Sequence, residues 1–206
     1  MATFPTTPIP TNVSIKSVNQ VYTSKFNNLN VEKRSNGAQR WEITLDYPVM
    51  NFTNGKSLFA FIMAHRGSLK TFDFSLPAPL NNTSGTHIGT FNIITGNSTG
   101  TSFSIGGMAV GATLKAGDMV QFSNHAKVYM ITADITADGL GQGTLNVIPP
   151  VAVDLVPNTT TAQCNNVVMT AGFVNNTPEI LIDNNSFYNL RSLKIEERFT
   201  VPVAVV

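Results

Sequence analysis

The chain has 206 residues and a formal net charge of +1, with 42% hydrophobic and 12% charged residues. That length allows one or two domains with a sizeable core, and the apolar fraction excludes a disordered chain. Nucleic-acid binding requires clustered cations, and the densest cluster is Lys33–Arg34 with Arg40 nearby, which argues against it as the main function. The lone cysteine, Cys164, excludes an intrachain disulfide and a Cys-based metal cluster.

Residues 1–13 contain three prolines and are predicted to form an extended arm. This stretch lacks a basic start and an apolar run, so we expect no signal peptide. No apolar run in the sequence approaches the roughly 20 residues of a membrane span. A strand is predicted over Ser14–Ser24, followed by a polar loop to Gly37.

The clearest predicted strand is Arg40–Tyr47, because large apolar residues alternate there with polar ones. One face is predicted to be buried and the other to be polar. The alternation sets Trp41, Ile43, Leu45 and Tyr47 against Arg40, Glu42, Thr44 and Asp46.

One helix is predicted after this strand, with Thr53 or Asn54 as its N-cap and Gly67 at its C-terminal end. Its apolar face recurs at i, i+3, i+4 and i+7. The strand Thr71–Leu76 follows. The residues of the helical face are Leu58, Phe61, Ile62 and His65.

Two polar linkers, Asn81–Gly85 and Asn158–Asn165, flank a region of short strands separated by turn residues. We therefore predict an outer domain built from both ends of the chain, 1–85 with 158–206, and an inserted β-barrel domain, 86–157. The predicted strands of the insertion are Thr86–Thr95, Thr101–Ile105, Met119–Ser123, Val128–Ala133 and Thr144–Ile148.

Three strands are predicted after the second linker, at Val167–Phe173, Glu179–Ile182 and Ser192–Phe199. In the last of these Glu197 falls on the apolar side, which predicts a bulge or a change of partner there. The fold class is therefore mainly β with one α-helix and an inserted small β-barrel.

No local motif for catalysis or metal binding is found. His65, His87 and His125 lack zinc spacing, and the acids Asp134 and Asp138 flank a hairpin loop without converging on a cleft. A three-histidine site or a Ser/His/Asp triad assembled in space stays open at this point. The prediction is no enzyme activity, no catalytic residue, no cofactor and no metal.

Aromatic residues of the insertion could form a sugar- or receptor-binding face, or fill its core. The core is the favoured interpretation, and burial of all four rings would remove the support for binding. They are Phe91, Phe103, Phe122 and Tyr129.

The order of these features resembles the distal tail proteins of long-tailed bacteriophages. A polar arm, a Trp-bearing strand, a helix and the strand FDFSLP precede an insertion containing LKAGDMVQFSNHAKVYMITADITADGLGQGTLNVIPP, and NLRSLKIEERF closes the core. The resemblance is to the kind with an oligonucleotide/oligosaccharide-binding (OB) type barrel inserted in a tail-tube-like domain, a β-sandwich or barrel.

The resemblance implies a hexameric ring with a central channel that joins the tail tube to the tip or baseplate hub. It also implies a platform for tail fibres, a location at the virion tail tip, and DNA passing through the channel without specific binding. No membrane partner is expected. The alternative function is a carbohydrate- or host-receptor-binding module of the tail tip.

Candidate interface residues lie on the polar faces of the strands at 40–47 and 192–199, and in the apolar C-terminal tail. The tail is expected to add to a neighbouring subunit. The candidates are Arg40, Glu42, Thr44, Asp46, Lys194, Glu196, Arg198, Val201 and Val203.

Overall fold

The computed structural model describes residues 1–26, 30–95, 100–177, 179–182, 188–190 and 192–199. With 46% strand and 11% helix, it confirms the predicted mainly β class. The chain divides into two compact units: Met1–Phe72 with Ala171–Arg198, and Asp73–Thr170 with Phe199. The domain limits 1–85 with 158–206, and 86–157, stay a prediction.

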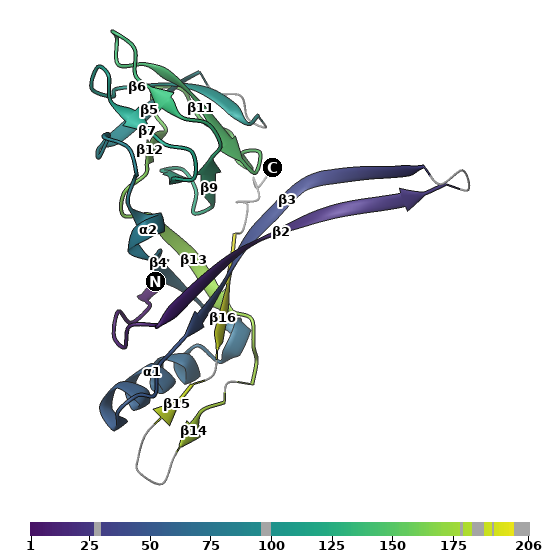
Figure 1. Ribbon diagram of the computed structural model, residues 1–206, viewed down its shortest axis with the longest axis vertical. Helices are drawn as coiled ribbons and strands as arrows, with labels where there is room; N and C mark the ends of the chain where they lie inside the picture. The colour runs from purple at the N-terminus through teal and green to yellow at the C-terminus, as the bar shows by residue number, and fades with distance from the viewer. Residues whose placement is uncertain (27–29, 96–99, 178, 183–187, 191, 200–206) are drawn as a thin grey trace, which may run out of the picture. The chain divides into compact units, whose positions relative to one another are not determined.

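A six-stranded sheet has the order β1-β4-β13-β16-β3-β2, so β2 forms one of its edges (Figure 1). The pairing of β2 with β3, of β3 with β16 and of β16 with β13 is antiparallel. The strands are β1 (Ala2–Thr3), β2 (Asn12–Lys25), β3 (Val31–Asp46), β4 (Thr71–Ser75), β13 (Val168–Phe173) and β16 (Leu193–Glu197).

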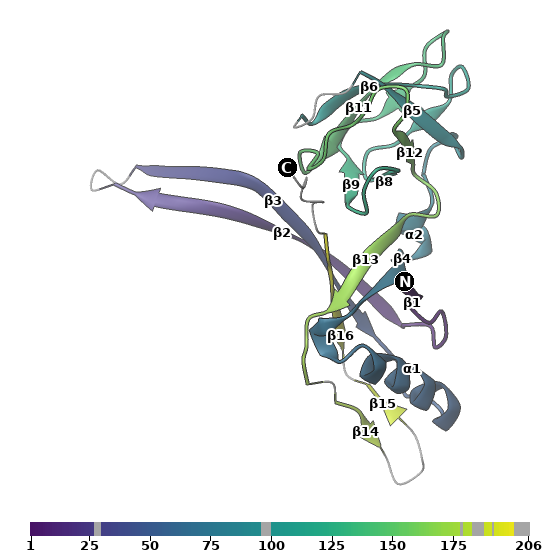
Figure 2. The same cartoon turned by 180° about the vertical axis from the view of Figure 1, so that it is seen from behind.

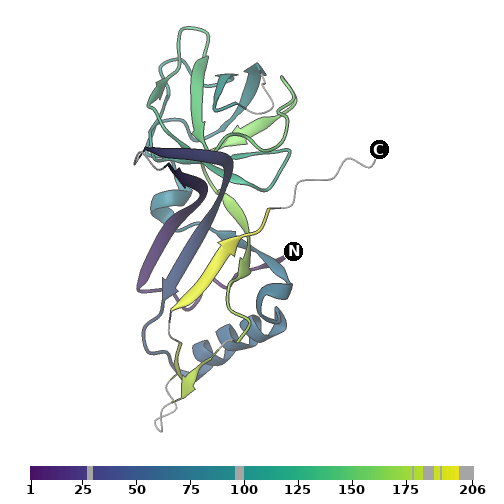
Figure 3. The same cartoon turned by 90° about the vertical axis from the view of Figure 1, so that its right-hand side faces the viewer.

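The alternation of β3 buries one face of the sheet, as predicted. Burial of such apolar side chains is the main favourable term in folding. Figure 3 shows β16, in yellow, beside β3, and β16 adds Leu193 and Ile195 to this core. Each apolar residue that β3 and the residue after it contribute to this core is at most 8% exposed, namely Trp41, Ile43, Leu45 and Tyr47.

Helix α1 (Phe52–Ala64) confirms the predicted helix but begins earlier than predicted. Its N-cap is Asn51, whose Oδ1 accepts a hydrogen bond from the Asn54 backbone N–H at 2.9 Å. Asn51 therefore satisfies a donor that the first helical turn leaves free. The predicted caps Thr53 and Asn54 lie inside this first turn instead.

At its other end α1 stops at the C-cap His65, two residues before Gly67. Gly67 has φ +64° and begins the short 3₁₀ helix η1 (Gly67–Leu69). His65 is 5% exposed, its Nδ1 lies 2.8 Å from the Phe61 carbonyl oxygen, and its ring packs on Phe61 and Phe72. His65 is thus a buried helix-end residue.

A second, four-residue helix, α2 (Ala78–Asn81), was not predicted. The strands β14 (Leu181–Ile182) and β15 (Tyr188–Asn189) form a small hairpin, and β15 packs on α1 (Figure 2). A side chain at Gly55 of α1 would collide with Tyr188, so only glycine allows this close approach.

From Val31 onward the predicted loop before Gly37 is instead the first half of β3, while residues 27–29 of that loop lie outside the described residues. Within the described residues Val21–Lys25 pairs only with Val31–Ser35, which makes a two-stranded ribbon that extends beyond the other strands of the sheet (Figure 1). A register shift between Asn19 and Val21 marks a bulge in the ribbon. Both faces of this part are exposed, so β3 has no buried alternation there that a sequence pattern could detect.

The second unit contains a closed six-stranded barrel of order β11-β6-β5-β12-β8-β9, which confirms the predicted barrel. A further pair, β7 with β10, is antiparallel. The strands are β5 (Thr90–Thr95), β6 (Ser102–Gly106), β7 (Thr113–Leu114), β8 (Met119–Phe122), β9 (Val128–Ile131), β10 (Ile135–Thr136), β11 (Gly143–Ile148) and β12 (Thr161–Gln163).

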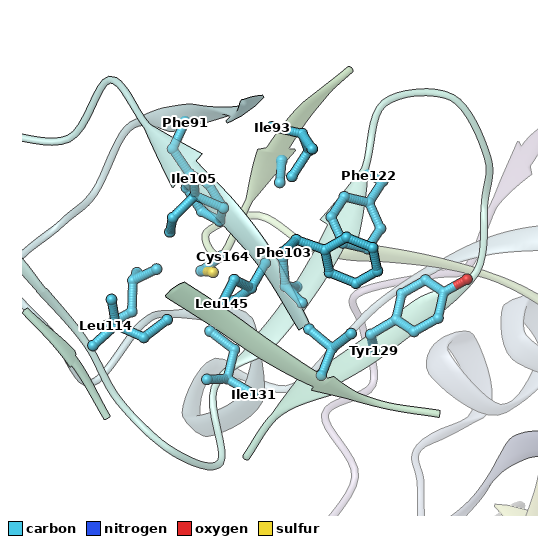
Figure 4. Packing of buried hydrophobic residues seen from close by; sticks show 14 of the residues in the cluster. Phe91, Ile93, Phe103, Ile105, Leu114, Phe122, Tyr129, Ile131, Leu145 and Cys164 are labelled. Atoms are coloured by element: carbon cyan, nitrogen blue, oxygen red, sulfur yellow. The ribbon is translucent and has the colours of Figure 1, made fainter. Parts of the chain in front are cut away.

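Strand β12 lies in the segment predicted to be a polar linker. Its central residue Ala162 is 1% exposed and pairs with both Phe91 and Phe122. A small residue fits between two large rings, so this strand contributes to the barrel without an apolar run of its own. Figure 4 shows the interior that these strands enclose.

The chain enters and leaves the barrel at one place, held by the buried carboxylate of Asp118. Asp118 accepts hydrogen bonds from Thr83 Oγ1 at 2.5 Å, from Ser84 N at 2.8 Å and from Lys115 N at 3.1 Å. The Thr83 N–H donates to Asn165 Oδ1 at 3.0 Å. Burial opposes ionisation of Asp118, but these hydrogen bonds outweigh it and lower its pKa.

Candidate oligomer interface

The register between β3 and β16 brings most of the candidate interface residues together on one face of the sheet. Glu196 pairs with Glu42 and Lys194 with Thr44. Because residues directly opposite each other in an antiparallel pair share a face, these four side chains lie on the side away from the apolar core. The two polar strand faces predicted from the sequence therefore form one continuous face in the structure.

Glu196 is the centre of a charged network on this face. Its carboxylate lies 2.8 Å from Arg40 Nη1 and 2.6 Å from Arg198 Nη2, and it is only 5% exposed. Arg40 also lies 3.4 Å from Glu42. Two arginines satisfy a carboxylate that would otherwise be costly to bury, while half of the Arg40 side chain stays in solvent.

The remaining candidates lie at the ends of this network or outside it. Asp46 pairs with Asn12 of β2 and accepts a hydrogen bond from Asn12 Nδ2 at 3.3 Å. Lys194 is exposed. Val201 and Val203 lie outside the described residues. Contact of any candidate with another copy of the chain stays a prediction.

A bulge, one of the two outcomes predicted at Glu197, is not found: β16 pairs with β13 in one register through Glu197, whereas its pairing with β3 ends at Glu196. β16 keeps one register with β3 from Leu193 to Glu196. The Glu197 side chain points into the core, is 4% exposed, and accepts a hydrogen bond from the Trp41 backbone N–H at 3.3 Å. A backbone partner thus accommodates an acid on the apolar side of the strand.

Sequence reasoning missed the exposed apolar residues of the β2–β3 ribbon. Four large apolar side chains there are half exposed, and groups of exposed apolar residues can mark an interaction site. Predicting two strands of equal length, one before and one after the Asn-rich stretch at 27–30, would have placed these residues in a ribbon. They are Val21 at 50%, Tyr22 at 57%, Phe26 at 50% and Val31 at 50%.

The barrel offers no aromatic binding face from the four rings considered. Phe91, Phe103, Phe122 and Tyr129 are at most 2% exposed, and Figure 4 shows all four among the core side chains. They fill the core, as the favoured interpretation predicted. The observation that would have supported a sugar- or receptor-binding module is therefore missing.

His125 lies in the link between β8 and β9 and connects two side chains there. Its Nε2 lies 2.7 Å from Tyr129 Oη and its Nδ1 lies 2.6 Å from Asn124 Oδ1. The Ala152 N–H donates to Tyr129 Oη at 3.1 Å, which leaves the phenol proton for His125 Nε2. Burial, with a smaller effect of the Lys127 charge, lowers the pKa of His125 to about 4, so the ring is neutral at pH 7.

A depression of about 400 Å³ is lined by residues of the paired strands β8 and β12 and of the link after β8. Amide and hydroxyl side chains contribute most of its lining, including Gln121, Ser123, Asn124, Thr161 and Gln163. Gln121 is already held by the backbone of Val168, to which it donates at 2.9 Å and from which it accepts at 3.3 Å.

Across the described residues, no group of three or more His, Cys, Asp or Glu side chains is placed to hold a metal ion. In the same part of the chain, no helix is long and apolar enough to cross a membrane. Cys164 is buried, and its pKa is raised by burial and by the nearby Asp118 charge, which keeps it a thiol.

Residues 83–180 match a family model described as "Distal tail protein pb9, B domain". The matched segment contains every strand of the closed barrel, together with β13. No curated protein has a sequence that matches the chain. The match confirms the resemblance to phage distal tail proteins that the order of features in the sequence indicated.

Proposed function

We propose that this chain, which carries a domain of the phage distal tail protein type, is a structural virion protein that forms a ring at the distal end of a bacteriophage tail. The match of residues 83–180 is the observation that carries the proposal. The family is structural, and we propose no catalytic role and no cofactor.

The open edge of the six-stranded sheet supports assembly. Among the described residues no strand pairs with the outer side of β2, which is 14 residues long. An unpaired edge of that length is a template for another strand, and a closed cyclic assembly pairs every such edge without leaving a growing end. A hexamer with a central channel is the assembly we propose.

The proposed subunit contacts are the candidate residues on β3 and β16, together with the C-terminal tail. Arg40 and Arg198 have partly exposed side chains whose guanidinium groups are already oriented by Glu196. Groups held in place lose little side-chain entropy when a partner binds. Val201 and Val203 would add an apolar contact to a neighbouring subunit.

In the virion, the ring would lie at the tail tip and join the tail tube protein to the tip or baseplate hub protein. DNA would pass through its channel without specific contacts. The inserted barrel, for which we propose an OB-type fold, would provide an attachment platform for tail fibres. The weakly charged surface, with 12% charged residues, is compatible with subunits packed side by side.

The alternative was a carbohydrate- or host-receptor-binding module of the tail tip. It relied on exposed aromatic residues in the inserted unit, and the four rings concerned are buried. Sugar sites rely on stacking surfaces that these rings do not supply. The ring-forming function is therefore the one we propose.

Native mass spectrometry of the purified chain at micromolar concentration tests the proposal. We expect a discrete species of six times the 22.2 kDa chain mass. A chain that stays monomeric at all accessible concentrations would contradict ring formation and would reopen the binding-module alternative.

A further inference from the structure

One face of the β2–β3 ribbon combines apolar and positively charged side chains. The register pairs Val21 with Ser35, Thr23 with Lys33 and Lys25 with Val31, so these side chains share a face. We call Val21, Lys25, Val31 and Lys33 the valine–lysine face. Both valines are 50% exposed.

The opposite face of the ribbon has a different character. Tyr22 pairs with Arg34 and Ser24 with Glu32, so one cation and one acid balance each other there. The valine–lysine face has two cations and no acid. It is therefore the side of the ribbon that suits an acidic and apolar partner.

A surface of that kind lies on the barrel, where two tight turns are tied together. In the first turn, the Ala112 N–H donates to the Ala109 carbonyl at 2.9 Å, and Gly111 has φ +73°. In the second, Asp138 Oδ1 accepts from the backbone N–H groups of Leu140 at 2.8 Å and Gln142 at 2.9 Å. We call residues 109–112 and 138–142 the twin-turn surface.

The two turns are bound to each other through the backbone. The Met108 N–H donates to the Gly141 carbonyl at 3.2 Å, and the Gly111 N–H donates to the Ala137 carbonyl at 3.1 Å. Each turn presents one aliphatic side chain to solvent, Val110 at 69% and Leu140 at 79% exposure. A rigid surface loses little conformational entropy on binding.

The charge of the twin-turn surface is negative. Asp138 is exposed, and the backbone hydrogen bonds from Gln142 and Leu140 lower its pKa, so its carboxylate is ionised at neutral pH. The nearby Asp134 is neutralised by Lys115, whose Nζ lies 2.7 Å from Asp134 Oδ2. Asp138 therefore gives the twin-turn surface its negative charge.

The same opposition of charge holds over larger parts of the chain. Residues 73–170 contain five aspartates against two lysines, a formal charge of −3. Because the whole chain carries +1, the remaining residues carry +4. The ribbon strands, residues 21–25 and 31–35, contain Lys25, Lys33 and Arg34 against Glu32, a formal charge of +2.

We propose that the valine–lysine face of one copy docks on the twin-turn surface of a second copy of the same chain. The valines would cover Val110 and Leu140, and Lys25 and Lys33 would lie near Asp138. This contact rests on the proposed self-assembly and adds to it a second interface, between a ribbon and a barrel, besides the pairing of sheet edges. It weakens as salt concentration rises, because its charges lie at an exposed surface.

Two charge-changing variants of the full chain test the contact. Lys25→Glu/Lys33→Glu makes the ribbon face acidic, and Val110→Lys/Leu140→Lys makes the twin-turn surface basic. All four positions are exposed, so folding should be unaffected, which circular dichroism would check. Each variant alone places like charges opposite each other and should weaken assembly by about tenfold or more in sedimentation velocity at low salt.

An equimolar mixture of the two variants is the decisive sample. The acidic ribbon of one variant meets the basic turns of the other, and the unchanged surfaces also match, so assembly should be restored with the two chains alternating. A contact of the ribbon with the barrel of its own chain would not be restored by mixing. Failure of the mixture to assemble would overturn the proposal.

Matched controls make the same charge changes elsewhere. Ile88→Lys/Val156→Lys removes two exposed aliphatic residues of the barrel, at 79% and 53% exposure, and Lys56→Glu/Lys70→Glu reverses two cations outside the ribbon. Both controls should assemble like the wild type. If the wild type assembles and the two test variants behave like the controls, the docking contact is wrong and ring formation stands. If the wild type does not assemble, both proposals fail.

Discussion

Asp118 is a residue whose role depends on partners far away in the sequence. It joins Thr83 and Ser84, where the chain enters the barrel, to Lys115 in the turn before β8. As one member of an Ala-Gly-Asp turn it gave no sequence signal for this role. Predicting this role would have required knowledge that residues 83–84 lie beside Asp118 in space.

Replacement of Asp118 by alanine is expected to lower the free energy of unfolding by about 1–3 kcal/mol, because the partly buried donors of Thr83, Ser84 and Lys115 lose their acceptor. Urea denaturation at pH 7 measures the effect. Asp154→Ala is the control, since Asp154 is exposed, and its effect should stay within about 0.5 kcal/mol. An Asp118 variant as stable as this control would show that the clamp contributes nothing.

His125 makes the stability of the barrel depend on pH. Its pKa is about 4 in the folded chain, against 6.5 for an unperturbed histidine, so the unfolded chain takes up a proton first as pH falls. The stabilisation is present above pH 6.5 and is lost as pH falls toward 4. Protonated Nε2 can no longer accept the Tyr129 proton.

NMR titration of the imidazole resonances measures this pKa directly. We expect His125 to titrate near 4. In the wild type the free energy of unfolding should decrease as pH falls from about 6.5 to about 5. This decrease should be smaller in His125→Gln, because the titrating group is gone. A midpoint near 6.5 in the wild type would refute the assignment of a partly buried, neutral imidazole.

At the scale of elements, prediction succeeded where a strand or helix has one buried face. The alternation of Trp41, Ile43 and Leu45 located the central part of β3, and the periodicity of Leu58 and Ile62 located α1. It failed for the ribbon half of β3, where neither face is buried, and for β12, whose packing depends on the small size of Ala162. The first failure concerns a hairpin without a buried face, and the second a strand whose partners β5 and β8 are distant in the sequence.

The approach of α1 to β15 is set by Gly55. Gly55→Val is expected to lower the free energy of unfolding by about 1–3 kcal/mol, because the new side chain would collide with Tyr188 and push the helix off the hairpin. Thermal unfolding compares this variant with Gly139→Val, where no neighbouring atom lies within 4 Å. Equal melting temperatures for the two variants would rule out a tight contact between α1 and β15.

At the scale of the whole molecule, the sequence predicted a mainly β chain with an inserted barrel and a polar strand face. The β3–β16 register then showed that Arg40, Glu42, Glu196 and Arg198 form one network, which no local pattern contains. The twin-turn surface could not be predicted either, because its two turns are 26 or more residues apart and are joined by backbone hydrogen bonds, which no side-chain pattern records. Both proposed interaction surfaces are therefore built from segments that are distant in the sequence.

Class-averaged electron micrographs of the purified full chain test ring formation most directly. We predict closed particles with sixfold symmetry and an open centre, since pairing of sheet edges around a ring leaves a channel. Isolated single chains at high concentration, or open filaments without closure, would contradict ring formation.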